Sequence, residues 1–254
     1  KDSISGINRP AVFCFSVKNT TLFQLEPNKI PDSFYVESEF TSGLTLSPDG
    51  KRVFFTIRKE VAIAEKFDGA QVWNGNDAVV YSERQTVEDL EFNTRIAAWW
   101  PEQDRFMLIT DQSKPFGFLN ASEDFAITYN KNDLGPQYIM ERNVNFFVTD
   151  LETGQRNLLL ENQSTQLETL SLSPGGKYFA YFKDNDWWVY NFLTGAHSNV
   201  TGRHELQLAD WEDKIWPINY RIVGWGVHDE YILVYDQFDI WQIDFKENKA
   251  VRLT

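Results

Sequence analysis

The stretch Ser173-Pro-Gly-Gly-Lys-Tyr-Phe-Ala-Tyr-Phe-Lys-Asp-Asn-Asp-Trp-Trp-Val-Tyr-Asn-Phe-Leu-Thr-Gly-Ala-His-Ser-Asn-Val-Thr201 is present twice in this chain. A shift of 53 positions places it, without a gap, on the segment from Gly226 to Thr254. The copies share identical residues at five positions, which in the first copy are Tyr178, Asp186, Trp188, Phe192 and Thr201. A unit that recurs at a fixed period of this length is typical of a repeat architecture.

Turn residues divide the repeated stretch into short segments with the composition of β-strands. Gly175-Gly176 and Asp184-Asn185-Asp186 bound an aromatic-rich segment, Lys177 to Lys183, as turns bound a strand. We expect strands at residues 170–172, 177–183, 187–191 and 196–201. Four antiparallel strands make one blade of a β-propeller, so the sequence predicts an all-β fold of four-stranded antiparallel blades.

Similar phrases mark further units. Leu44-Thr-Leu-Ser-Pro-Asp-Gly-Lys-Arg-Val-Phe-Phe-Thr-Ile57 resembles the phrase that begins at Leu170, and the segment Ile96–Thr110 is a degenerate copy. We therefore expect one partial propeller domain over residues 1–254, with about four blades and an irregular N-terminal one. Its units are approximately 1–40, 41–92, 93–162, 163–215 and 216–254.

Two segments exceed the repeat. About thirty residues from Asp111 to Asn143 extend the third unit, and Gly202 to Tyr220 joins the fourth unit to the fifth. Insertions of this kind usually form loops on one face, often the binding face. The last residue, Thr254, occupies the repeat position of Thr201. We expect this incomplete set of blades to be a portion of a longer protein.

Composition limits the classes of partner. Lys and Arg number 24 against 37 Asp and Glu, a net charge of −13, which disfavours nucleic acid and anionic membrane surfaces. Hydrophobic residues make up 42% of the chain, a globular balance, but no apolar run is long enough for a membrane span. The opening residues contain no signal-peptide pattern.

Neither a metal nor a cofactor is expected. The single cysteine, Cys14, lies between two phenylalanines, where a buried apolar thiol is favoured over a reactive one. The segment Asp184-Asn185-Asp186 has the residues of a calcium loop but not its spacing, so we interpret it as a hairpin turn.

No catalytic residue is assigned in this chain. The sequence contains no G-x-S-x-G, H-E-x-x-H, P-loop or G-x-G-x-x-G motif. The histidines His197, His204 and His228 lack a Ser or Cys in a recognisable catalytic setting.

Two groups remain as binding candidates. Trp187, Trp188 and Trp241 could form a stacking platform for a sugar or peptide, although their repeat positions favour packing between blades. The acidic cluster Glu205, Asp210, Glu212 and Asp213 has the charge to hold an amino terminus, and it also fits a solvated loop.

The blade-opening phrases resemble the propeller repeats of the prolyl oligopeptidase family of serine peptidases and those of the Tol-system periplasmic propeller. The segment Ile222–Asp244 and the ending Val251-Arg-Leu-Thr254 are similar to a blade of the large secreted, dipeptidyl aminopeptidase-like members found in Bacteroides-type bacteria. The likeness is good from Leu170 to Thr254.

This resemblance implies an N-terminal propeller that caps a C-terminal α/β-hydrolase domain with a Ser-Asp-His triad, and no residue here matches that triad. Dipeptidyl members hold the substrate amine with a Glu pair in an Asp-Trp-x-x-Glu-Glu setting, which Asp210-Trp-Glu-Asp213 faintly resembles. The resemblance therefore suggests Trp211, Glu212 and Asp213 as substrate-binding residues.

The leading functional hypothesis is a non-catalytic propeller portion of a bacterial periplasmic or secreted serine peptidase, which gates peptide access to a hydrolase domain absent from this chain. The alternative is a stand-alone propeller, similar to that of the Tol system, that binds protein or glycan through the Asp111–Asn143 segment. An exposed strand edge at Val251–Thr254 also predicts pairing between chains.

Overall fold

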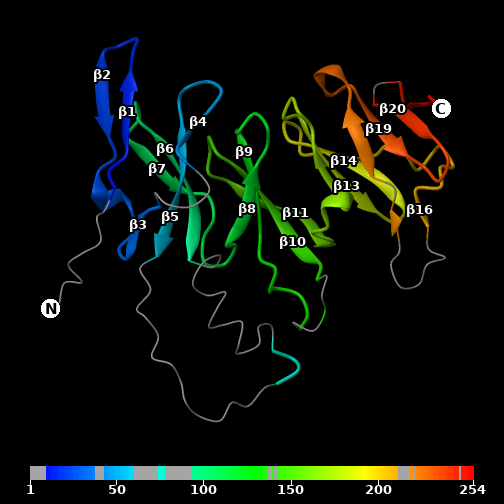
Figure 1. Cartoon of the computed structure of the whole chain (residues 1–254), viewed down its shortest axis with the longest axis horizontal. Helices are drawn as coiled ribbons and strands as arrows, with labels where there is room; N and C mark the ends of the chain where they lie inside the picture. The colour runs from blue at the N-terminus through cyan, green and yellow to red at the C-terminus, as the bar shows by residue number, and fades with distance from the viewer. Residues whose placement is uncertain are drawn as a thin grey trace. The chain divides into compact units, whose positions relative to one another are not determined.

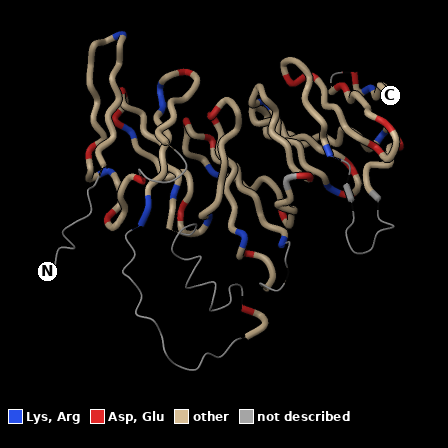
Figure 2. The backbone as a smooth tube through the Cα atoms, in the orientation of Figure 1, with Lys and Arg blue, Asp and Glu red and all other residues tan. Residues whose placement is uncertain are grey.

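The computed structural model describes residues 10–37, 43–59, 74–77, 93–136, 139, 142–210, 218–219, 221–245 and 247–254, most of which form strands and the turns between them (Figure 1). The chain divides into two units. The first comprises residues 1–118 with 127–140, and the second comprises residues 119–126 with 141–254. Charged residues lie mostly in turns and at strand ends (Figure 2).

The N-terminal strands form two sheets. The first sheet has two strands, β1 (Phe13–Ser16) and β2 (Thr21–Gln24), and a 3-10 helix η1 (Pro27–Lys29) follows it. The second sheet contains β3 (Phe34–Val36), β4 (Thr45–Leu46), β5 (Val53–Lys59), β6 (Thr94–Trp100) and β7 (Arg105–Leu108). Both β3 and β4 pair with β5.

The remaining strands form three sheets of four and one of two. The third sheet contains β8 (Phe116–Leu119), β9 (Phe125–Tyr129), β10 (Val144–Asp150) and β11 (Arg156–Gln163). The fourth contains β12 (Leu170–Leu172), β13 (Tyr178–Lys183), β14 (Asp186–Asn191) and β15 (His197–Asn199), preceded by η2 (Leu167–Thr169). The last contains β18 (Ile222–Trp225), η3 (Val227–Asp229), β19 (Tyr231–Tyr235), β20 (Ile240–Asp244) and β21 (Lys249–Arg252). Between these two, β16 (Ala209–Asp210) pairs with β17 (Ile218–Asn219).

The two copies of the repeated stretch fold alike. Both sheets are antiparallel with strands in sequence order, and the 53-residue shift relates their registers. Trp188 lies opposite Asn199 in the first copy, and Trp241 lies opposite Arg252 in the second. The predicted all-β fold of four-stranded antiparallel blades is therefore confirmed.

Residues 96–110 do not open a further repeat unit. This segment was expected to open a further unit, but its strands β6 and β7 extend the sheet of β5. The next sheet begins instead with β8 and β9, inside the Asp111–Asn143 segment that was expected to be an inserted loop. The segment resembles a blade opening because its apolar strand β7, which is the fourth strand of a blade, has a composition similar to that of a second strand such as β5.

The turn between the first two strands has a left-handed residue at the same position in four sheets. Its fourth residue is in the left-handed region, with φ of 73° at Gly50, 57° at Glu123, 75° at Gly176 and 59° at Asp229. In each turn the amide of this residue donates to the carbonyl three residues earlier. Glycine adopts this conformation without steric cost, whereas Glu123 and Asp229 adopt it against the usual preference of side-chain-bearing residues.

Side chains join these turns to one another within the second unit. Asn120 Nδ2 donates to the Gly176 carbonyl oxygen at 2.8 Å. The Asp229 carboxylate accepts from Ser173 Oγ at 2.7 Å and from the Gly175 amide at 2.9 Å. Asp229 is only 2% exposed, and buried charges of this kind are held by hydrogen bonds that replace water. These hydrogen bonds therefore hold the turns of consecutive sheets against each other.

A threonine hydroxyl links the third and fourth strands in three sheets. The amide of Ile96 donates to Thr110 Oγ1 at 2.8 Å, and Trp187 donates to Thr201 Oγ1 at 2.8 Å. The amide of Ile240 donates to Thr254 Oγ1 at 3.0 Å. The spacing of 14 residues is the same in each pair, which explains why threonine is kept at the end of both copies of the repeat.

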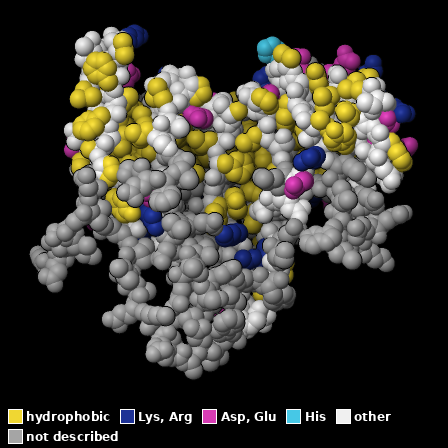
Figure 3. Space-filling view, in the orientation of Figure 1, with side chains coloured by type: hydrophobic (Ala, Val, Ile, Leu, Met, Phe, Trp, Pro, Cys, Tyr) yellow, Lys and Arg dark blue, Asp and Glu magenta, His cyan; other side chains and the backbone are white. Residues whose placement is uncertain are grey.

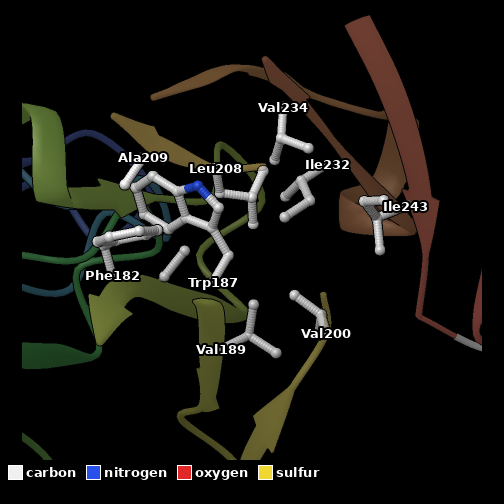
Figure 4. Packing of buried hydrophobic residues seen from close by; sticks show 10 residues of the cluster. Phe182, Trp187, Val189, Val200, Leu208, Ala209, Ile232, Val234 and Ile243 are labelled. Carbon is white, nitrogen blue, oxygen red and sulfur yellow. The ribbon is translucent and has the colours of Figure 1, made fainter. Parts of the chain in front are cut away.

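Each unit has a hydrophobic core between sheets. In the first unit, buried residues such as Val12, Ile57 and Trp99 bring the β1–β2 hairpin onto the β5–β6 sheet. In the second unit, Trp187 and Ile232 belong to one cluster that joins sheet β12–β15 to sheet β18–β21 (Figure 4). Most of the buried members of the second cluster are aromatic or β-branched residues, which pack well between facing sheets.

Replacement of Gly176 by alanine tests the contact between turns. A Cβ at Gly176 would lie 2.6 Å from the Ser122 amide nitrogen, whereas a Cβ at Gly50 would meet nothing within 4 Å. Both residues have a positive φ, so Gly50→Ala should cost about 1–2 kcal/mol. Gly176→Ala adds a backbone clash, and we expect a further loss of about 1–3 kcal/mol in urea unfolding. Equal losses for the two variants would contradict close contact between the turns.

Candidate functional site

The acidic segment proposed from the sequence lies between two paired strands. Trp211, Glu212 and Asp213 lie outside the described residues. The strands on either side of them pair in antiparallel fashion, with Ala209 opposite Asn219. Ala209 is 7% exposed and belongs to the core cluster of the second unit. The ends of the candidate segment are therefore held together and anchored to a buried core.

Two other polar residues precede this hairpin. Glu205 is exposed, and its backbone is in the left-handed conformation with φ of 48°. The His204 amide donates to the Thr201 carbonyl at 2.9 Å, and its Nε2 is buried without a hydrogen-bond partner in the described part of the chain. Of the cluster predicted from the sequence, only Glu205 is placed as an exposed carboxylate.

The tryptophans pack rather than form a platform, as their repeat positions indicated. Trp187 is completely buried in the core cluster, and Trp241 packs against the same cluster. The ring of Trp188 stacks on Tyr181 with centroids 6.4 Å apart. The Trp241 indole donates to Asp236 Oδ2 at 2.7 Å. These contacts fix the rings within and between sheets.

The segment Asp184-Asn185-Asp186 is a hairpin turn, as predicted. Asp184 and Asn185 have φ values of 53° and 66°, the pattern of a two-residue type I′ turn. The Asp186 carboxylate accepts from Asn199 Nδ2 and from Thr201 Oγ1, both at 2.9 Å. In the residues that the structure describes, no group of three His, Cys, Asp or Glu side chains is arranged to hold a metal ion.

His197 packs against two tyrosines. A hydrogen bond of 2.9 Å joins the Tyr181 hydroxyl and His197 Nδ1, and the His197 ring packs against Tyr190 at 4.9 Å. Burial raises the pKa of Tyr181 to about 12. Burial and the nearby Lys183 charge lower the pKa of His197. At neutral pH the pair therefore consists of a neutral phenol and a neutral imidazole.

His228 lies in the turn after β18, in the left-handed conformation with φ of 58°. Its carbonyl oxygen accepts from Lys177 Nζ at 2.9 Å. The backbone of His228, rather than its imidazole, thus contributes to the contact between consecutive turns. These contacts give neither His197 nor His228 a nucleophile to activate.

Asp229 is the structurally important polar residue that the sequence patterns missed. It occupies the repeat position of Gly176, and the aligned turn offered no reason to expect a buried carboxylate there. The signal was present in the preceding copy, because Ser173 and Gly175 provide a hydroxyl and an amide that point to one acceptor. Only the stacking of consecutive turns makes that complementarity visible.

Cys14 packs against the core of the first unit and is partly buried. Its neighbours in the sequence, Phe13 and Phe15, are 51% and 56% exposed. The thiol thus lies on the core side of β1, and the phenylalanines lie on the opposite side, as alternation along a strand requires.

Comparison with known proteins gives a fold but not a family. No protein-family model matches this chain, and a comparison with curated protein sequences finds no significant match. The dipeptidyl peptidase 4 of Porphyromonas gingivalis is similar in structure, with a TM-score of 0.51 and 12% sequence identity. The similarity covers 98% of this chain and 37% of that enzyme.

Two other solved structures are more distant. TolB from Acinetobacter baumannii has a TM-score of 0.36 and 12% identity, over 65% of this chain and 38% of TolB. The β-propeller domain of the Trilobed protease from Pyrococcus furiosus has a TM-score of 0.39 and 11% identity, over 83% of this chain and 57% of that domain. The chain spans less than two fifths of the length of the dipeptidyl peptidase 4 and of TolB. At these identities the likeness to the peptidase shows the propeller fold alone.

The lowered pKa of His197 predicts a pH dependence of stability. As the pH falls below the ordinary value of 6.5, the unfolded chain binds a proton at this imidazole before the folded chain does. The contribution of the neutral His197 to the free energy of unfolding is therefore fully present above pH 6.5, and it decreases as the pH falls toward the pKa in the folded state. We expect the free energy of unfolding of the His197→Gln variant, measured in urea at several pH values, to lack this decrease below pH 6.5.

The imidazole can also be followed directly by NMR. The His197 signal, assigned by its absence in the His197→Gln variant, should titrate below 6.5 in the folded protein. A midpoint at or above that value would contradict the burial of this ring beside Tyr181.

Proposed function

We propose that this chain is the non-catalytic propeller portion of a bacterial serine peptidase related to the prolyl oligopeptidase family, and that it gates peptide access to an α/β-hydrolase domain outside this chain. The observation that carries the proposal is the structural similarity to the Porphyromonas gingivalis dipeptidyl peptidase 4, which extends over 98% of this chain. The blade-opening phrases at Leu44 and Leu170 support the same assignment.

The proposed roles of the two domains, catalysis by the hydrolase and control of access by the propeller, follow from the chemistry of peptide hydrolysis. A serine peptidase needs an activated hydroxyl, a general base and an oxyanion hole. None of the motifs that supply these groups is present in the sequence, so the catalytic groups belong to the hydrolase domain. The propeller contributes walls of rigid sheets, which restrict the size of the peptide that reaches the nucleophile.

An extracytoplasmic location is part of this proposal. It is supported by the resemblance to secreted and periplasmic propellers, since TolB is among the structural neighbours. Within the described part of the chain, no helix has the length and hydropathy needed to cross a bilayer.

Peptidase assays on two proteins test the proposal. We expect the purified 254-residue chain to show no turnover of dipeptide-anilide substrates, because the chain lacks a nucleophile setting. The full-length product of the same gene should cleave them, and a covalent serine-hydrolase inhibitor should abolish that cleavage.

Two results would count against the proposal. One is turnover by the chain itself that persists after inhibitor treatment. The other is a full-length gene product whose intact mass is close to the 29.6 kDa of this chain, which would favour a stand-alone binding propeller.

Substrate recognition is proposed for the acidic hairpin segment. Glu212 and Asp213 would bind the positively charged amino terminus of the peptide, with Trp211 beside them. In the full-length enzyme, Glu212→Gln and Asp213→Asn should each raise KM for free-amine substrates by about tenfold or more, the cost of losing a charged hydrogen bond.

A matched carboxylate controls for general charge effects. Glu247 is exposed and lies outside the acidic cluster, in the turn after β20, so Glu247→Gln should leave KM within about twofold of the unmodified enzyme. N-acetylated substrates should respond equally weakly to all three variants. An equal rise in KM for acetylated and free-amine peptides would exclude amine recognition by this segment.

A further inference from the structure

Residues Asn74 to Asp77 form a polar turn that the proposed function does not use (Figure 1). Hydrophobic side chains gather over the strands on the face shown in Figure 3, whereas this turn contains only asparagine, glycine and aspartate. The Asp77 amide donates to the Asn74 carbonyl oxygen at 3.1 Å, which closes the turn. Asn74, Gly75 and Asn76 are exposed, so water reaches the amide side chain of Asn74.

The side chain of Asn74 folds back onto the backbone. Its Oδ1 accepts a hydrogen bond from the Asn76 amide at 3.1 Å, the arrangement known as an Asx turn. This contact directs the side-chain carbonyl group toward the peptide bond that joins Asn74 to Gly75. The Asn76 N–H also lies where negative charge would develop on Oδ1 if a nucleophile added to Cγ, and a backbone N–H in that position stabilises such an oxyanion.

The Gly75 nitrogen is the nucleophile closest to that carbon along the backbone. Asn74-Gly75 is the only Asn-Gly pair in the sequence. Within the described part of the chain, the Gly75 amide donates to no acceptor, and a Cβ at Gly75 would meet no described atom within 4 Å. The approach of this nitrogen to Asn74 Cγ therefore breaks no hydrogen bond of its own and has no side chain of residue 75 in its way.

We propose that Asn74 is a site of spontaneous deamidation in the folded chain. The Gly75 nitrogen gives its proton to solvent hydroxide and bonds to Asn74 Cγ, the Cγ–Nδ2 bond breaks, and ammonia leaves after taking a proton from water. The product is a five-membered succinimide ring, which water opens at either carbonyl. Cleavage of the bond between nitrogen and Cγ gives aspartate, and cleavage of the bond between nitrogen and the backbone carbonyl carbon gives isoaspartate. The net reaction consumes one water molecule and releases one ammonia molecule.

The turn at Asp49-Gly50 has a similar geometry but is protected. Asp49 Oδ1 accepts from the Lys51 amide at 3.1 Å, which is the equivalent of the contact in the Asn74 turn. The Gly50 amide, however, already donates to the Ser47 carbonyl oxygen at 2.8 Å. The hydrogen bond from Ser47 Oγ also lowers the pKa of Asp49 to about 2. At neutral pH this side chain is therefore a carboxylate, which resists addition of a nucleophile.

Asn130 is a matched control that has the same amide group. Its Oδ1 accepts from the Asn132 amide at 3.0 Å, but the residue that follows it is Lys131 rather than glycine. Its Nδ2 donates to the Ser113 carbonyl oxygen at 3.2 Å, which holds the nitrogen that would have to leave. We therefore expect Asn130 to be stable under conditions in which Asn74 reacts.

The conversion changes both the charge and the backbone of the turn. Either product adds one negative charge to a chain whose net charge is −13. In isoaspartate the backbone passes through Cβ and Cγ of residue 74, and the carbonyl group that accepts from the Asp77 amide becomes part of a free carboxylate. The modified residue is then a substrate for enzymes that methylate isoaspartyl carboxylates.

Peptide mapping of the aged protein tests the proposal. The purified 254-residue chain and its Gly75→Ala variant are incubated at neutral and at mildly alkaline pH and then digested. Mass spectrometry follows the conversion of amide to acid at Asn74 and Asn130, and methyl transfer by a protein-isoaspartate methyltransferase detects isoaspartate. Gly75 does not have a left-handed φ, so alanine fits this turn.

We expect Asn74 to be converted first, with isoaspartate among the products, at a rate that rises with pH because the attacking nitrogen must lose its proton. Gly75→Ala should slow the conversion at least ~10-fold, since a Cβ crowds the attacking nitrogen. Asn130 and Asp49 should remain unmodified over the same period.

Three results would overturn the proposal. The first is conversion of Asn130 as fast as that of Asn74, and the second is an unchanged rate at Asn74 in the Gly75→Ala variant. The third is an Asn74 that stays intact in the folded chain and reacts only after unfolding in urea, because the turn would then protect the amide. None of these measurements depends on peptidase activity, so their outcome is separate from that of the proposed function.

Discussion

The structure depends on one left-handed residue in the turn between the first two strands of a sheet. That conformation brings the turn amide back onto the carbonyl three residues earlier, and it occurs at Gly50, Glu123, Gly176 and Asp229. A glycine there leaves room for the neighbouring turn to approach, as Ser122 approaches Gly176. An aspartate there supplies an acceptor to the donors of the preceding turn. The same left-handed turn position therefore serves two kinds of contact between sheets, one steric and one electrostatic.

Face-to-face packing provides the larger part of the cohesion. In the second unit, apolar side chains of one sheet pack against apolar side chains of the next sheet along the chain. Trp187 meets Ile232 in this way, and Phe146 meets Phe179 one sheet earlier. The polar contacts at the turns then fix the register that apolar packing alone leaves loose, since hydrogen bonds are directional and dispersion forces are not.

The sequence predicted the fold where the repeat is explicit and failed where it is degenerate. The strands of residues 170–254 follow from identical residues at a fixed period, and the hairpin at Asp184 follows from turn chemistry. The third sheet was misassigned because Asn120-Ala-Ser-Glu keeps the turn geometry without keeping the Ser-Pro-x-Gly residues. Asp229 was missed for a related reason, because its role depends on a turn 54 residues away. The acidic candidate residues Glu212 and Asp213 were named by resemblance, and they lie outside the described residues.

The order of strands has a consequence for synthesis on the ribosome. In the sheets β12–β15 and β18–β21 every ladder joins consecutive strands, so each sheet closes only short loops as it forms. A sheet can therefore assemble as soon as its own residues leave the exit tunnel. The apolar face that packs on the following sheet then stays uncovered until that sheet is translated. During its synthesis the protein therefore passes through a series of intermediates, one per sheet, that each expose an apolar surface to chaperones.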